Sequence, residues 1–116
     1  MPGLKEQIDR AIAAHTTWKT RLAGAIAAGA SEVEVDKVRA DDVCEFGIWL
    51  HQDCDAATRA NAHYAKVVGL HAEFHREAAR VLSQALAGQR REAQELLNGK
   101  YSARSRDLML ALMAWK

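Results

Sequence analysis

The spacing of the apolar residues restricts the fold of this chain more than any other feature. No proline follows Pro2, so no residue of this type interrupts a helix after that point. Inward-facing positions recur every three or four residues along several stretches, which is the period of one face of an α-helix. Alanine is abundant and β-branched residues are sparse, a composition that favours helix almost throughout. The sequence therefore predicts an all-α fold.

Four helices are expected. The first carries an N-terminal stripe and should end at Gly29, which suits a left-handed terminating residue. That stripe is Leu4, Ile8, Ala11, His15, Trp18, Leu22 and Ala25. After a connection over residues 30–40, a short second helix should carry residues 44–50, with Asp41 and Asp42 as candidate N-caps.

The third and fourth helices are separated by Gly88, which interrupts the periodic pattern. The stripe of the third helix is Tyr64, Val68, His71, His75, Ala78, Leu82 and Leu86. The fourth stripe stays in phase across Gly99 and predicts one long helix. Four amphipathic helices with short connections predict an antiparallel four-helix bundle. Small residues such as Gly24, Gly47 and Gly69 would let its helices approach closely.

Length and charge limit the classes of function. The 116 residues fit a single domain spanning residues 1–116. A net charge of +1 does not indicate binding to nucleic acid or to an anionic membrane surface. No apolar run approaches the roughly 20 residues that span a bilayer, and the charged N-terminus lacks a secretion signal. We therefore expect a cytoplasmic protein whose Cys44 and Cys54 are reduced, which favours metal or redox chemistry over a structural disulfide.

Three histidines lie on inward faces of the predicted helices. A single buried histidine is commonly a core residue that bonds a backbone carbonyl, and a single buried cysteine is commonly a core thiol. The spacing of His71 and His75, however, aims two imidazoles at one point. With His15 from another helix and Cys44, they form a set of three nitrogens and one sulfur. That set suits tetrahedral zinc, at about 2.0–2.1 Å to nitrogen and about 2.3 Å to sulfur.

Three separated motifs carry a resemblance to a known family. They are His15-Thr16-Thr17-Trp18, Cys44-Glu45-Phe46-Gly47-Ile48-Trp49-Leu50 and His71-x-x-x-His75. In order and separation they resemble the chemoreceptor zinc-binding (CZB) domains of bacteria. The resemblance implies a four-helix antiparallel bundle, usually homodimeric, and a zinc ion held by His15, Cys44, His71 and His75. It also implies a signalling partner, because family members accompany chemoreceptors or diguanylate cyclases.

A site with four protein ligands leaves no vacancy for a substrate, which indicates a structural or regulatory zinc ion. No catalytic motif appears elsewhere, so we do not expect an enzyme. Either zinc occupancy or oxidation of Cys44, for example by hypochlorous acid, would be the signal; the resemblance implies both. One alternative is a docking bundle in which zinc is only a staple. Another is a di-iron bundle of the hemerythrin-like kind, which needs more inward histidines and bridging carboxylates.

The remaining polar and aromatic residues are given simpler roles. Trp18 and Trp49 should pack around the metal. The residues expected at the surface are His51, His63, Glu73 and Glu77. Cys54 is either a spectator or a partner for oxidised Cys44. Zinc with one thiolate would leave a charge of about +1, which water or a nearby carboxylate such as Asp9, Asp41 or Asp42 could offset.

Overall fold

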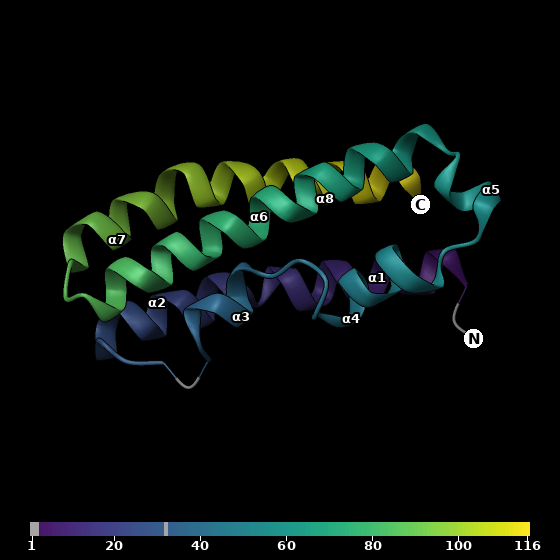
Figure 1. The fold of residues 1–116 in the computed structure, drawn as a ribbon. Helices are drawn as coiled ribbons and strands as arrows, with labels where there is room; N and C mark the ends of the chain where they lie inside the picture. Colours follow the sequence, from purple (N-terminus) through teal and green to yellow (C-terminus); the bar gives the residue numbers. More distant parts are fainter. Residues whose placement is uncertain (1–2, 32) are drawn as a thin grey trace.

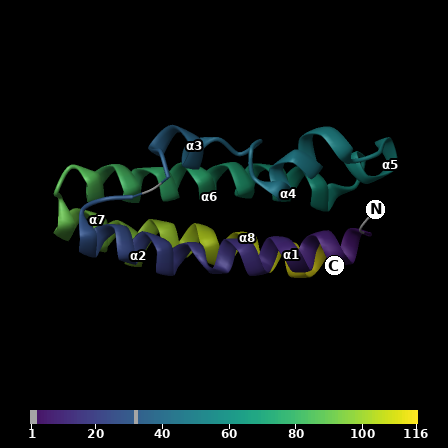
Figure 2. The same cartoon turned by 90° about the horizontal axis from the view of Figure 1, so that it is seen from below.

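A computed structural model describes residues 3–31 and 33–116 of the chain. Across those two ranges the regular structure is helical and contains no strand, which confirms the all-α prediction. Three long helical segments lie side by side along a body of 45 × 23 × 18 Å, and a series of short helices accompanies them (Figures 1 and 2). Within the same ranges, none of the helices combines the length and the apolar character that crossing a membrane requires.

The first long segment consists of α1 (Leu4–Thr16) and α2 (Trp18–Ala28). Thr17, between them, keeps a right-handed helical backbone (φ −71°, ψ −17°), and its hydroxyl donates to the carbonyl of Ala14 at 2.8 Å. The two helices therefore continue in nearly one direction, much as the single predicted helix would. Gly29 ends the segment at φ +67°, and its N–H donates to the carbonyl of Ala25 at 2.8 Å. This left-handed ending was predicted.

The second long segment is α6 (Ala62–Leu86), which begins where the side chain of Asn61 accepts a hydrogen bond from the N–H of His63 at 2.8 Å. The chain reverses at Gly88, whose φ is +77°. The third segment follows as α7 (Arg90–Leu96), a π-helical turn (Leu97–Tyr101) and α8 (Ser102–Trp115). The helix thus continues through Gly99 as predicted, but by a wider turn, in which Ser102 Oγ donates to the carbonyl of Leu97 at 2.7 Å.

Residues 33–61 form the short helices, which lie along α6 (Figure 2). They are α3 (Val35–Arg39), α4 (Glu45–Ile48), a π-helical turn (Trp49–Asp53) and α5 (Ala56–Arg59). Several short helices, and not one continuous helix, occupy this side of the molecule. The expectation of a four-helix bundle is therefore not confirmed. The N-cap prediction was wrong: Cys44 itself caps α4, and Asp41 and Asp42 lie in the bend before it.

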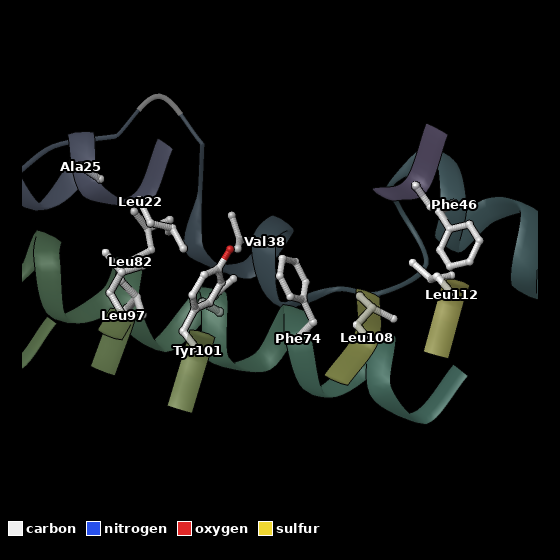
Figure 3. Packing of buried hydrophobic residues seen from close by; sticks show 14 of the residues in the cluster. Leu22, Ala25, Val38, Phe46, Phe74, Leu82, Leu97, Tyr101, Leu108 and Leu112 are labelled. Carbon is white, nitrogen blue, oxygen red and sulfur yellow. The ribbon is translucent and has the colours of Figure 1, made fainter. Parts of the chain in front are cut away.

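The core lies between α6 and its neighbours, with Phe74 and Tyr101 fully buried at its centre (Figure 3). The glycines do not contribute as expected. A Cβ atom at Gly24 or Gly69 would meet no atom within 4 Å, so neither glycine mediates a close helix contact. Gly47 does make a close contact, but with the loop backbone at Asp41.

Candidate metal centre

Four side chains from three parts of the fold converge beside the centre of α6. His15 comes from the last turn of α1, Cys44 from the start of α4, and His71 and His75 from adjacent turns of α6. The three histidines are 0–3% exposed, and Cys44 is half-buried. One potential ligand atom of each residue lies within 4.8 Å of every other. The structure therefore brings together all four residues that the sequence selected.

Four of the six distances between these atoms are close to the edges of a tetrahedron around zinc, and the other two are within 4.8 Å. His71 Nε2 lies 3.2 Å from His15 Nε2 and 3.0 Å from His75 Nε2. Cys44 Sγ lies 3.4 Å from His71 Nε2 and 3.6 Å from His75 Nε2. Around tetrahedral zinc, ligand nitrogens lie about 3.3 Å apart and a sulfur about 3.6 Å from each nitrogen. In these four pairs the donor atoms are thus spaced much as zinc would require.

The outer ring nitrogens determine which atoms face the centre. His15 Nδ1–H donates to the carbonyl of Ala11 at 2.7 Å, and His75 Nδ1–H donates to the carbonyl of Val38 at 2.8 Å. Because a carbonyl only accepts, both Nδ1 atoms carry the proton, and each neutral ring presents a bare Nε2 lone pair to the centre. His71 Nε2 can donate to only one of them. A cation would bind the lone pairs of His15 and His75 together, and also that of His71 Nε2 when the His71 proton is on Nδ1.

Burial keeps the imidazoles in the form that binds metals. It lowers the pKa of His15 from 6.5 to about 4, although the hydrogen bond to Ala11 opposes the shift. Burial also lowers the pKa of His71, and the neighbouring His75 and His15 lower it further. The pKa of His75 is lowered by burial against the effect of the Val38 carbonyl. At neutral pH all three rings are therefore uncharged and free to bind a cation.

The thiol of Cys44 is held in place by its own helix start. Burial raises the pKa of this thiol, and the N–H of Gly47, which donates to Sγ at 3.3 Å, opposes that effect. A Cβ atom at Gly47 would overlap the carbonyl oxygen of Asp41 and lie 2.8 Å from its carbonyl carbon. Only glycine at position 47 leaves room for the backbone of Asp41. The Cys-x-x-Gly spacing therefore sets both the N-cap of α4 and the position of the Cys44 sulfur. A bound metal would deprotonate the thiol.

Aromatic rings enclose the buried imidazoles. The ring of Phe46 stands edge-on to His71 at 5.3 Å, and that of Phe74 stands edge-on to His15 at 5.1 Å, between ring centroids. Trp49 stacks outside Phe46 at 5.7 Å. Trp49 therefore packs around the site as expected, one ring further out. Sequence reasoning missed the two phenylalanines, although each lies within three residues of a predicted ligand.

Trp18 has a different neighbour from the one expected. It is half-buried beneath the guanidinium of Arg21, which lies 4.1 Å from its ring centroid. The surface assignments hold for His63, which is exposed, and for Glu73, which is 44% exposed beside Arg104. Glu77 was expected in solvent, but its side chain is only 14% exposed, and it pairs with Arg80 at 3.1 Å.

Of the three carboxylates expected beside the ligands, Asp42 is exposed and the other two form ion pairs. Asp9 pairs with Lys116 at 2.6 Å and is engaged at the end of the molecule. Asp41 pairs with the exposed His51 at 3.4 Å. Burial is the largest influence on both pKa values: it raises that of Cys44 and lowers that of His75. The charge of Asp41 makes a smaller contribution that raises both. Asp41 therefore lies close enough to offset part of the charge of a bound cation. Cys54 lies outside the four-residue group.

Comparison with known protein families agrees with this geometry. The family model described as "Chemoreceptor zinc-binding domain" matches residues 15–82, a range that begins at His15 and includes the other three clustered residues. No significant match was found among curated protein sequences or among solved structures.

Proposed function

Because this chain belongs to the chemoreceptor zinc-binding domain family, we propose that it binds one zinc ion through His15, Cys44, His71 and His75. In this proposal the chain is a sensory or regulatory module and not an enzyme. The observation that carries the proposal is the spacing of the ligand atoms, 3.0–3.2 Å between nitrogens and 3.4–3.6 Å from sulfur to nitrogen.

Four protein ligands account for the preference for regulation over catalysis. Zinc held by three imidazoles and a thiolate has no open position for water or substrate, whereas catalytic zinc keeps one. The hydrogen bonds from His15 and His75 to backbone carbonyls orient the two rings before the ion arrives. Zinc at this site would supply a link between parts of the chain that are otherwise joined by side-chain packing.

The signal would arise at Cys44. Its helical stretch, α4 and the π-helical turn that follows, covers only residues 45–53, whereas the other ligands lie on helices of 13 and 25 residues. Breaking the zinc–sulfur bond therefore frees the least anchored of the three elements. Either a fall in zinc concentration or oxidation of the thiolate, for example by hypochlorous acid, would have this effect. The released segment would be read by a partner domain such as a chemoreceptor or diguanylate cyclase, in a cytoplasmic homodimer.

A metal assay of the purified protein tests the proposal. We expect one zinc per chain in the wild type, and a much lower affinity in Cys44→Ser because the sulfur is lost. Cys54→Ser is the matched control, since Cys54 lies outside the cluster, and it should bind zinc like the wild type. Absence of bound zinc, or unchanged affinity in Cys44→Ser, would overturn the assignment of the ligands.

Treatment with hypochlorous acid then separates a sensor from a staple. A sensor should release zinc in proportion to the oxidation of Cys44, with increased hydrogen exchange in residues 41–53. Zinc that withstands both mild oxidant and chelation would identify a purely structural role. A visible absorption band typical of an oxo-bridged di-iron centre would instead indicate the hemerythrin-like alternative.

A further inference from the structure

A small cavity lies beside the candidate metal centre, between α1 and the start of α4. Its volume is about 40 Å³, which is enough for more than one water molecule. Its lining includes exposed residues, Arg10 and Glu45, and two of the four ligand residues, His15 and Cys44. The cavity therefore lies between exposed side chains at its outer rim and two of the four candidate ligand residues.

Two polar groups along this cavity suit a passing cation. Gln7 is only 8% exposed, and it lines the cavity. The carboxylate of Glu45 lies at the outer rim, next in sequence to Cys44. An amide oxygen and a carboxylate oxygen are both ligands that a divalent ion accepts while it sheds water.

An ion pair crosses the outer rim. Arg10 Nη1 donates to Glu45 Oε1 at 3.2 Å, which joins α1 to the residue after Cys44. Both side chains are more than half exposed, at 51% and 69%. Exposed pairs of this kind are weak, so this one opens readily and shifts an opening equilibrium by no more than about five-fold. While it is closed, the guanidinium occupies the carboxylate that would first meet an incoming cation.

We propose that this cavity is the route by which a divalent metal ion reaches the four ligands, with Glu45 and Gln7 as its first contacts and Arg10 as the group that closes the rim. The proposal rests on the proposed function, since it requires that the ligands bind a metal. It assigns a role to three residues that are not ligands. It also predicts that they control the rates of metal uptake and release and leave the equilibrium affinity unchanged.

The first test measures access without any metal. In a Cys54→Ser background the only thiol is Cys44, so the rate of alkylation of the metal-free protein by iodoacetamide reports access to it. We expect Arg10→Gln and Glu45→Gln each to raise this rate by about two- to five-fold, because either removes the pair. Rates measured over a range of pH separate a change in access from a change in thiol ionisation. Arg91→Gln, which removes the exposed 3.3 Å pair with Glu95, is the matched control and should have no effect.

The second test uses Co²⁺, whose thiolate complexes absorb visible light, in stopped-flow uptake and in release to a chelator. Arg10→Gln should accelerate uptake and release by the same factor, so the dissociation constant stays constant. Glu45→Gln should slow uptake although its rim is open, because the first cation ligand is lost. A merely structural effect would change the affinity instead.

Equal alkylation rates in wild type and Arg10→Gln, or a comparable increase in Arg91→Gln, would overturn the proposed route while leaving metal binding intact. Uptake that is as fast in Glu45→Gln as in Arg10→Gln would overturn the role of Glu45 as a cation contact. If the wild type takes up no metal while Arg10→Gln still speeds alkylation, the proposed function fails, and the cavity is a route for small molecules to the thiol only.

Discussion

Acid should destabilise the metal-free protein, because the three histidines of the candidate site are buried in the neutral form. Burial lowers the pKa of His15 from 6.5 to about 4, so between these values the unfolded chain binds a proton that the folded chain does not. Stability is therefore fully present above pH 6.5 and falls as the pH drops toward 4. Each pKa unit corresponds to about 1.4 kcal/mol, so His15 alone removes about 3 kcal/mol over this range. His71 and His75 act in the same direction, because their pKa values are also lowered.

Urea denaturation in the presence of a chelator measures this loss. The free energy of unfolding, followed by far-UV circular dichroism, would be compared at about pH 7.5 and about pH 5, where His15 should already account for about 2 kcal/mol. His15→Phe is the control, because a phenylalanine there faces the rings of Phe46 and Phe74 and does not titrate. The variant should lose about 2 kcal/mol less than the wild type over the same pH interval. Equal losses in both proteins would refute the argument that His15 is buried in its neutral form.

Three further substitutions follow from the packing. Gly47→Ala should weaken zinc binding, because the added Cβ overlaps the Asp41 carbonyl and displaces Cys44. Competition with a chelator measures this change in affinity. The control, Gly24→Ala, lies at an open helical position and should instead stabilise the fold by up to about 1 kcal/mol. Phe74→Ala should cost about 3–5 kcal/mol in urea denaturation, because this fully buried ring supports His15 and Tyr101; a loss below 1 kcal/mol would contradict that packing. Tyr101→Phe should be neutral or stabilising by about 1–3 kcal/mol, since its buried hydroxyl has no partner among the described residues. A clear loss of stability in Tyr101→Phe would show that the hydroxyl is bonded after all.

The sequence alone determined the helical class, most of the inward stripes and the four residues of the candidate site. Leu4 and Leu86, each at the outer end of a predicted stripe, are exposed instead. Helical hydrogen bonds join residues four apart, so the period of a stripe is local information. For this reason the sequence placed His71 and His75 on one face, the end of the first helix at Gly29 and the continuity through Gly99. The order of the three sequence motifs then assigned His15 and Cys44 to the same site as His71 and His75.

Tertiary structure alone decided how residues 33–61 are arranged and what surrounds the ligands. The carbonyl of Val38 bonds His75, 37 residues away, and the backbone of Asp41 rests on Gly47. No periodicity encodes such contacts, because they depend on the distances between segments that only packing brings together. Short helices gain too few internal hydrogen bonds to form independently of these contacts. The capping role of Cys44, the aromatic rings around the imidazoles and the cavity beneath Arg10 therefore emerged only from the folded chain.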